Sequence, residues 1–490
     1  MFKRILRLLT VIYLSLFALL FVACNTEEND LPEGSTTFTI YSLNDFHGML
    51  TKSGSYPGIS RIGEYLMSNY EESPETTLIL SAGDMFQGTA VSSLTKGRAV
   101  VDVMNTIGFD AMTIGNHEFD WGIEEVLKYQ DGNLENGEAE FPFLAANIKD
   151  KKTGQLASWA TPYTVVEKGG FKIGVIGVIG VGQESDIFVN YVKDYEFTDE
   201  LAAISKYAEI LRNDEDCDLV IVSAHNDTES YNYKLAKLNG DCRIDAILNG
   251  HTHQYYQGYE TKYRNGYAAV PYVQSGCYGG YVGKITITID NKTKITTAST
   301  AEVIDARVRC DDESSSINEV LDRYNEYINI EKEVLGVSGT NIYKDQGGVW
   351  ACNVLRDATG ADLGVANTGG IRSNGFPIYQ NSNITYGDIF EIMPFENKVC
   401  TTYLYGSDII TLINKGVFVS DNVDVNNEKI NGEYIEYNKK YKVATIDFLF
   451  MKSNYPFLNG TDSEFLDLLF REALVENVRN NVEKNGIFLP

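Results

Sequence analysis

The five histidines of this 490-residue chain all lie in short motifs beside Gly, Asp or Asn. These motifs, with one Gly-Asp pair, are Asn44-Asp45-Phe46-His47-Gly48, Gly83-Asp84, Gly115-Asn116-His117-Glu118-Phe119-Asp120, Ala224-His225 and Gly250-His251-Thr252-His253. Imidazole and carboxylate groups are ligands that suit Zn, Mn, Fe and similar divalent ions. One such histidine alone would more often be an ordinary polar residue near a strand end. Because no histidine falls outside the motifs, the pattern predicts a metal site.

Apolar, β-rich runs precede most of these motifs. We expect strands at Phe38–Leu43, Leu78–Ser81, Ala111–Ile114, Phe143–Ala146, Lys172–Ile179, Leu219–Ser223, Ala246–Leu248 and Lys284–Ile289. Five of the first seven are followed at once by a motif, and loops at strand ends hold side chains on a rigid platform that stays open to ligand. The layout predicts a β-sandwich flanked by helices, with the metal ligands along one edge.

The second part of the chain mixes helices and strands. Ser314 to Glu333 has apolar residues at helical spacing, which predicts one helix leading into a further domain from about Gly336 to Pro490. Within that domain we expect helices at Trp350–Ala358 and Gly406–Lys415 and a strand at Asp362–Ala366.

Composition limits the classes of partner. With 43% hydrophobic and 22% charged residues the chain is globular, and 490 residues predict two or three domains. The formal charge of −27 repels nucleic-acid backbones, so a nucleic acid polymer is not expected as a partner. A small anion can still bind where metal ions reverse the local field.

The first residues have the pattern of an export signal. A basic start with Lys3, Arg4 and Arg7 precedes an apolar run, Leu8 to Val22, that is short for a membrane span. It ends in Phe21-Val22-Ala23-Cys24, which resembles a bacterial lipoprotein signal although Leu is usual where Phe21 stands. We expect residues 1–24 to be the signal, 25–35 a tether, and the protein to be extracytoplasmic and lipid-anchored at Cys24. A plain secretory signal or an N-terminal anchor is the alternative.

The remaining cysteines carry no predicted chemistry. Six of them spread over more than 450 residues do not make a disulfide scaffold. Cys217 and Cys242 are close enough in sequence to bridge around a helix, and this stays open. No C-x-x-C spacing occurs, so no metal or redox role is assigned to them.

The ordered motif set resembles the calcineurin-like metallophosphoesterases, and its fuller forms resemble their 5′-nucleotidase branch. The resemblance implies an α/β (α+β) fold, a four-layer β-sandwich flanked by helices with a second, α+β, substrate-binding domain. It implies a catalytic domain at 36–305, a linker helix at 306–335 and the substrate-binding domain at 336–490. It also implies two divalent ions, Zn, Mn or similar, which clamp the attacking and leaving oxygens of a phosphoryl transfer and acidify a bound water.

The same resemblance distributes the ligands. One ion takes Asp45, His47 and His253, the other takes Asn116, His225 and His251, and Asp84 bridges them. Some relatives have Gln where this chain has His253, which bears on the preferred metal. The neutral amide of Asn116 keeps the site from becoming too anionic to admit a phosphate.

His117 follows a ligand but is better interpreted as the catalytic imidazole. Asp120, three residues on, is positioned to accept its ring N–H and to favour the protonated form. His117 would then stabilise charge on the phosphoryl oxygens or assist the leaving group. Alternatively, Asp120 caps a helix that begins at Asp120-Trp121-Gly122.

The segments Gly360-Ala361-Asp362, Asn367-Thr368-Gly369-Gly370-Ile371-Arg372, Ile384-Thr385-Tyr386-Gly387-Asp388 and Met393-Pro394-Phe395-Glu396-Asn397 resemble the 5′-nucleotidase C-terminal domain. Asn367 and Arg372 match its polar substrate positions, and Phe395 and Phe448 match the two rings that stack the base. The alternatives are a surface arginine and two core rings.

This chain departs from that pattern in three places. Only Lys344 is cationic where relatives carry further phosphate-binding arginines, Asn454 stands where they have Asp, and Thr368 replaces a Gly. These changes affect recognition of the nucleoside, not the reaction.

We therefore expect a secreted phosphohydrolase that acts on nucleoside 5′-monophosphates by metal-hydroxide attack. The same chemistry on UDP-sugars, 2′,3′-cyclic nucleotides or other phosphate esters is the first alternative. A non-catalytic, substrate-binding lipoprotein is the second, but such a protein need not retain a bridging Asp84 beside His117. A nuclease conflicts with the charge of −27.

Overall fold

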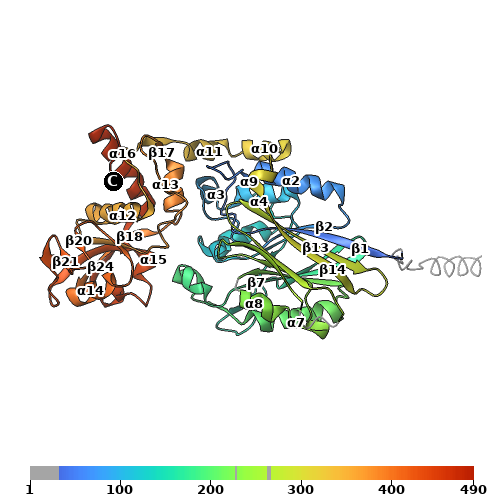
Figure 1. The fold of residues 1–490 in the computed structure, drawn as a ribbon. Helices are drawn as coiled ribbons and strands as arrows, with labels where there is room; N and C mark the ends of the chain where they lie inside the picture. Colours follow the sequence, from blue (N-terminus) through green and yellow to red (C-terminus); the bar gives the residue numbers. More distant parts are fainter. Residues whose placement is uncertain (1–32, 227–228, 262–265) are drawn as a thin grey trace, which may run out of the picture.

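The structure, a computed structural model, describes residues 33–226, 229–261 and 266–490. The predicted signal with Cys24 and most of the predicted tether lie outside the described residues. Two bodies lie side by side, an N-terminal body through β14 and a C-terminal body from β15, with α10 and α11 leading from one to the other (Figure 1). In the part of the chain that the structure describes, no helix is long and apolar enough to cross a membrane.

Two six-stranded sheets form the centre of the N-terminal body. The first has the order β14 (Thr296–Asp305), β13 (Tyr281–Asp290), β1 (Ser35–Leu43), β2 (Thr77–Ser81), β3 (Ala111–Thr113) and β4 (Phe143–Leu144). The second has the order β11 (Tyr255–Glu260), β12 (Val270–Ser275), β10 (Ala246–Asn249), β9 (Leu219–His225), β7 (Phe171–Ile179) and β6 (Tyr163–Lys168). β1 to β4 run parallel, as do β7, β9, β10 and β12, so their carboxyl ends meet at common edges.

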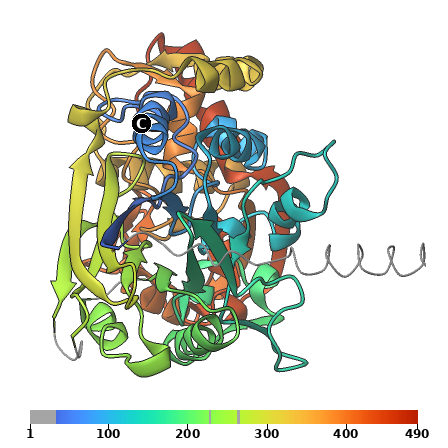
Figure 2. The ribbon, with the colours of Figure 1, turned by 90° about the vertical axis from the view of Figure 1, so that its right-hand side faces the viewer.

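Alternating side chains bury both faces of these sheets. Phe38 and Ile40 of β1 point between the sheets and meet Ile173 of β7, whereas Tyr41 and Leu43 point outward. The helices α2 (Ile59–Glu72) and α4 (Arg98–Ile107) lie over the first sheet. The helices α7 (Glu200–Asn213) and α8 (Glu229–Leu235) lie on the opposite side (Figures 1 and 2). The four-layer fold predicted for this part is confirmed.

A mixed sheet forms the centre of the C-terminal body. Its order is β19 (Phe418–Val419), β16 (Leu363–Ala366), β23 (Lys440–Ile446), β18 (Lys398–Tyr405) and β24 (Thr461–Leu469). The helices of this body are α12 (Lys344–Thr359), α13 (Tyr386–Ile392), α14 (Gly406–Ile413), α15 (Asp447–Phe450) and α16 (Phe470–Asn485). A separate core, with Trp350 and Phe470 fully or almost fully buried, makes this the expected second α+β unit.

Further short helices and strands lie between these elements. In the N-terminal body they are α3 (Ala90–Leu94), α5 (Ile123–Leu127), α6 (Val189–Val192), α9 (Ala306–Arg309), β5 (Ile148–Asp150) and β8 (Tyr195–Phe197). In the C-terminal body they are β15 (Val334–Val337), β17 (Asn383–Thr385), β20 (Val423–Asp424), β21 (Lys429–Ile430) and β22 (Glu433–Tyr434).

The predicted linker helix is wrong in one respect. It is two helices, α10 (Ser315–Asp322) and α11 (Asn325–Glu331), separated at Arg323 and Tyr324. Tyr324 has φ −106° and ψ 13°, its side chain is buried, and its hydroxyl donates to Asp102 Oδ2 of α4 at 2.7 Å. This long-range hydrogen bond fixes a turn between the two helices, at a point where the apolar periodicity of the sequence predicts an uninterrupted helix.

The other predicted elements exist with small shifts at their ends. All eight predicted strands lie on β1 to β4, β7, β9, β10 and β13, and the two predicted helices of the C-terminal body are α12 and α14. The bridge left open between Cys217 and Cys242 is not formed, because both cysteines are free. The predicted domain boundaries stay predictions.

Candidate metal centre and substrate cavity

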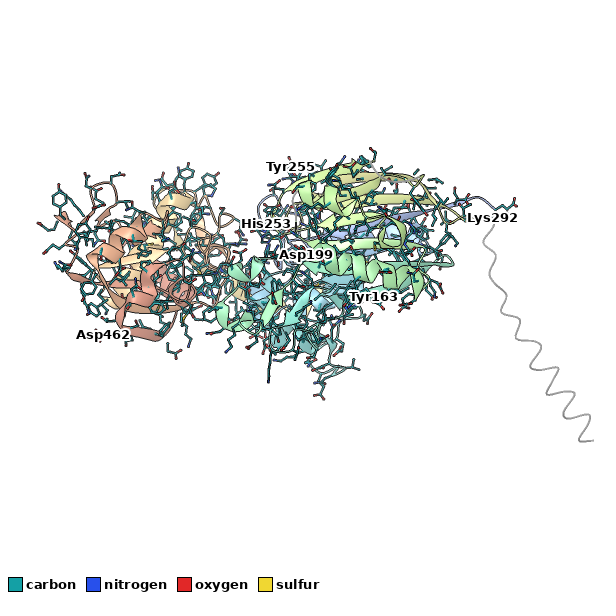
Figure 3. All side chains as sticks on the ribbon, turned by 90° about the horizontal axis from the view of Figure 1, so that it is seen from below. Tyr163, Asp199, His253, Tyr255, Lys292 and Asp462 are labelled. Atoms are coloured by element: carbon teal, nitrogen blue, oxygen red, sulfur yellow. The ribbon has the colours of Figure 1, made fainter. Side chains whose placement is uncertain are left out.

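Parallel pairing brings the predicted ligands to one edge of the sandwich. The loop after β1 carries Asp45 and His47, and the loops after β2 and β3 carry Asp84 and Asn116. His225 ends β9, and His251 and His253 follow β10. His253 lies at the end of the N-terminal body that faces the C-terminal body (Figure 3).

The ligand atoms form two groups. Asp45, His47 and His253 make one group, and Asp84, His225 and His251 make the other, with the atoms of each group within 4.8 Å of one another. Asn116 joins the second group, since its Oδ1 lies 3.1 Å from His225 Nε2 and 3.1 Å from His251 Nδ1. All seven predicted ligands are thus brought together in the division that the resemblance implied.

The chemistry of these groups fits divalent cations. His47 Nε2 and His253 Nε2 face each other at 3.0 Å, a pair of ring nitrogens that a shared cation would satisfy. Burial and Arg372 lower the pKa of His253 to about 3, and burial holds the pKa of His47 well below its usual range. Both rings are therefore neutral, which is the form that binds a metal.

The remaining ring nitrogens orient three of these imidazoles. His47 Nδ1 donates to the Gln87 carbonyl and His225 Nδ1 to the Ala82 carbonyl, both at 2.8 Å. His251 Nε2 lies 4.0 Å from the Asp186 carboxylate. Such outer partners fix which nitrogen faces a metal. Asp186 was not among the predicted site residues, because it lies far from every motif in sequence.

The ligand backbones are in an unfavourable conformation. Five of the seven have a positive φ, namely Asp45 (48°), His47 (51°), Asp84 (56°), His251 (85°) and His253 (61°). A non-glycine residue held there costs on the order of 1–3 kcal/mol, and such strain gathers at functional sites. The surrounding loops must therefore be held firmly.

Glu118 stabilises two of these ligand loops. Its fully buried carboxylate accepts backbone N–H groups from the Asp84 loop and the Asn116 loop, from Asp84 (2.9 Å), Met85 (2.9 Å), Phe86 (3.3 Å) and Gly115 (2.7 Å). The loops are so close that a Cβ at Gly115 would lie 2.2 Å from Asp84 Oδ1. Glu118 was not among the predicted site residues, although its position as a carboxylate inside a ligand motif was the available signal.

His117 and Asp120 form the predicted pair. Nδ1 of His117 lies 2.7 Å from Asp120 Oδ2, and both side chains are largely buried. Burial lowers the pKa of His117, but the carboxylates of Asp120 and Asp84 outweigh it and the pKa is raised. The alternative that Asp120 caps a helix is not supported, because α5 begins at Ile123 with Gly122 as its N-cap.

One cavity of about 1420 Å³ between the two bodies collects most of the predicted residues. Ten of the thirteen predicted site residues line it, namely Asp84, Asn116, His117, Asp120, His251, His253, Asn367, Arg372, Phe395 and Phe448. Asp45, His47 and His225 are buried directly behind them in the ligand groups. The cavity therefore joins the candidate metal centre to the C-terminal body.

The four residues predicted to bind substrate, Asn367, Arg372, Phe395 and Phe448, line this cavity, and the two rings also pack against the C-terminal core. Phe395 and Phe448 are half-buried, and the Phe395 ring stacks on His117 with 5.9 Å between centroids. The Arg372 guanidinium lies 5.7 Å from the centre of the Phe395 ring. Asn367 Oδ1 has no hydrogen-bond partner within the described residues. These groups are free to contact a ligand.

Comparison with known proteins decides the family. Residues 38–255 match the calcineurin-like phosphoesterase family, and residues 333–459 match the 5′-nucleotidase C-terminal domain. The chain belongs to the 5′-nucleotidase family. As a member of the 5′-nucleotidase family it is a metal-dependent hydrolase of phosphoric esters, and the two ligand groups are its candidate metal sites.

Relatives of this 5′-nucleotidase family member extend over most of its length. A 5′-nucleotidase of Vibrio cholerae is 26% identical over 447 residues, which cover 80% of this chain and 78% of that protein. Endonuclease YhcR of Bacillus subtilis is 29% identical over 417 residues, 78% of this chain, but the match spans only 33% of that protein. The solved 5′-nucleotidase precursor of Thermus thermophilus shares the fold, with a TM-score of 0.72, 20% identity, and coverage of 91% and 96% of the two chains.

Proposed function

We propose that this protein holds two divalent ions and releases inorganic phosphate from nucleoside 5′-monophosphates. The observation that carries the proposal is the single cavity shared by the ligand groups, the His117–Asp120 pair and the rings of Phe395 and Phe448. A nucleotide needs these three kinds of contact at once, for its phosphoryl group, its leaving oxygen and its base. The names of relatives such as the Vibrio cholerae 5′-nucleotidase support the assignment.

The ligand groups would hold the ions, with Asp84 between them. When bound, two such ions supply an acidified water as nucleophile and neutralise charge on the phosphoryl oxygens. His117 acts beside them. Asp120 Oδ2 accepts a hydrogen bond from Nδ1 at 2.7 Å. Nε2 is therefore the nitrogen that can hold a proton toward a phosphoryl oxygen or the leaving oxygen.

The C-terminal body would bind the rest of the nucleotide. The planar guanidinium of Arg372 can donate two parallel hydrogen bonds to a phosphate, and Asn367 offers to the same cavity an amide oxygen that can accept a hydrogen bond from the substrate. The base would stack between Phe395 and Phe448, a contact that contributes about 1–3 kcal/mol per base in related systems.

A larger phosphate ester is the second candidate substrate. A cavity of about 1420 Å³ exceeds the roughly 300–1,000 Å³ typical of small-molecule sites, so a UDP-sugar also has room. The hydrolysis itself would be the same. The changed positions Lys344 and Asn454 both line this cavity, where Lys344 would contact phosphate oxygens and Asn454 the part of the substrate beyond the phosphate.

We further propose that the protein works outside the cytoplasm, anchored by a lipid on Cys24. The sequence from Lys3 to Cys24 supports this, with its basic start, apolar run and terminal Cys. Cys24→Ser is expected to release the enzyme from the membrane fraction without changing its activity. If the variant stayed in the membrane fraction, anchoring by a lipid on Cys24 would be excluded.

Release of phosphate from AMP, UDP-glucose, 2′,3′-cyclic AMP and a plain aryl phosphate tests the substrate assignment. We expect AMP to have the highest kcat/KM. Strong turnover of the aryl phosphate with none of AMP would exclude the nucleotide. Preference for UDP-glucose would favour the second candidate.

A further inference from the structure

Three cationic side chains line the substrate cavity, those of Lys344, Arg372 and Lys452. Within the described residues none of the three has a carboxylate at ion-pair distance, and Lys344 donates only to Ser373 Oγ at 3.0 Å. The chain has 68 acidic residues against 41 Lys and Arg, so unpaired cations gathered in one cavity are unexpected. Their natural partners are acceptor atoms of a ligand.

These cations occupy two different places. Arg372 lines a small pocket together with the metal-group residue His47, and Lys344 donates to Ser373, the residue after Arg372, so Arg372 stands close to both Lys344 and the metal-ligand groups. Lys452 has other neighbours. Burial lowers its pKa, and the one charged group that opposes this is Asp186. Lys344 and Arg372 therefore serve the phosphoryl end of the cavity, whereas the aromatic neighbour of Lys452 is Phe448.

Lys452 lies beside the ring that we assign to the base. It follows Phe448 by four residues just after α15, and its Nζ lies 4.3 Å from the centre of the Phe448 ring. The flexible side chain of lysine allows the ammonium to move to the rim of the ring while it stays in the cavity. A base stacked on Phe448 thus brings its edge within reach of this ammonium.

An ammonium distinguishes bases by their exocyclic groups, because it has three donors and no acceptor. The carbonyl oxygen at C6 of guanine and hypoxanthine, or at C4 of uracil, accepts a hydrogen bond from it. The amino groups of adenine and cytosine at the same positions are donors and oppose it. We propose that Lys452 is a specificity-determining residue, an inference that rests on the proposed function. It selects nucleotides whose base carries a carbonyl oxygen at this position (oxo bases) over those whose base carries an amino group (amino bases).

The test compares kcat/KM for IMP with AMP and for UMP with CMP, in the wild type and in Lys452→Met. We expect the wild type to favour the oxo partner of each pair by about tenfold, as befits one charge-assisted hydrogen bond, and Lys452→Met to lose that preference. Lys452→Arg retains a cationic donor and should keep it. Lys439→Met, at an exposed lysine of the same body, is the matched control and should behave as the wild type.

Two results would overturn the inference. The first is an unchanged ratio of IMP to AMP turnover in Lys452→Met. For the second, adenosine 3′,5′-bisphosphate is assayed beside the four monophosphates. A fall of kcat/KM in Lys452→Met that is confined to this bisphosphate would assign Lys452 to a second phosphate. Absence of turnover with every nucleotide would instead overturn the proposed function, and the inference with it.

Discussion

The Nε2 atoms of His47 and His253 lie 3.0 Å apart, although 206 residues separate them in the chain. Two ring nitrogens at this distance repel each other unless a proton or a metal ion lies between them. Burial and Arg372 lower the pKa of His253 to about 3, so its ring is neutral, and His47 Nε2 is an acceptor because Nδ1 of that ring donates to the Gln87 carbonyl. The pair belongs to one of the two candidate ligand groups, and a divalent ion would satisfy both nitrogens.

Removal of metal is expected to abolish hydrolysis of every substrate and to lower the melting temperature. An ion present at 100 times its dissociation constant stabilises the folded state by about 2.7 kcal/mol. Calorimetry and phosphate release before and after chelation, and after return of Zn or Mn, measure both effects. Full activity in protein shown by elemental analysis to be free of metal would exclude the mechanism.

Glu118→Gln is expected to destabilise the fold and to weaken metal binding together. An amide NH₂ replaces one carboxylate oxygen, which leaves two of the four backbone N–H groups without an acceptor. At about 1–3 kcal/mol for each unsatisfied donor, we expect the free energy of unfolding to fall by about 2–4 kcal/mol. Chemical denaturation measures it, with the exposed Glu124→Gln as control. An unchanged free energy of unfolding would show that Glu118 does not hold the Asp84 and Asn116 loops together.

His117→Ala is expected to lower kcat by about 10²–10⁴-fold with little change in KM, the usual contribution of a positioned acid or base. Asp120→Asn should lower kcat less, because the imidazole remains. Steady-state kinetics together with metal content check this prediction. If His117→Ala lost metal in proportion to activity, the residue would be a ligand and not a catalytic group.

Loss of either base-stacking ring is expected to act on the nucleotide and not on the reaction. Phe395→Ala or Phe448→Ala should raise KM for AMP by about tenfold, within the range for one base–aromatic contact. KM for an aryl phosphate should change much less. Equal increases for both substrates would mean that the two rings are structural.

Asp186→Ala is expected to weaken metal binding at the group that contains His251. The carboxylate lies 4.0 Å from His251 Nε2, on the side away from the Nδ1 atom that faces Asn116. Loss of such an outer partner typically reduces metal affinity by about 10–100-fold. Competition with a chromophoric chelator measures the affinity, and the exposed Asp194→Ala is the control. Equal affinities would show that Asp186 does not orient His251.

Local sequence was sufficient to predict the strands that position the site. Phe38–Leu43 and Lys172–Ile179 are buried strands because runs of apolar, often β-branched, residues leave few other stable conformations. The motifs lie at their carboxyl ends, and the residue types there already restrict the chemistry to metal ligation. The apolar periodicity from Ser314 to Glu333 likewise indicated helix, but it contained no sign of the turn at Tyr324.

What the sequence by itself determined is the reaction chemistry, because ligand type and strand-end placement are local properties. The tertiary structure decided the rest through contacts between distant residues. Glu118 accepts from loops more than thirty residues apart, and Asp84 and His251 keep positive φ angles only because their surroundings hold them. The Lys452–Phe448 contact is local, but the cavity itself is lined by residues of both bodies, so substrate selection depends on packing that no single segment encodes.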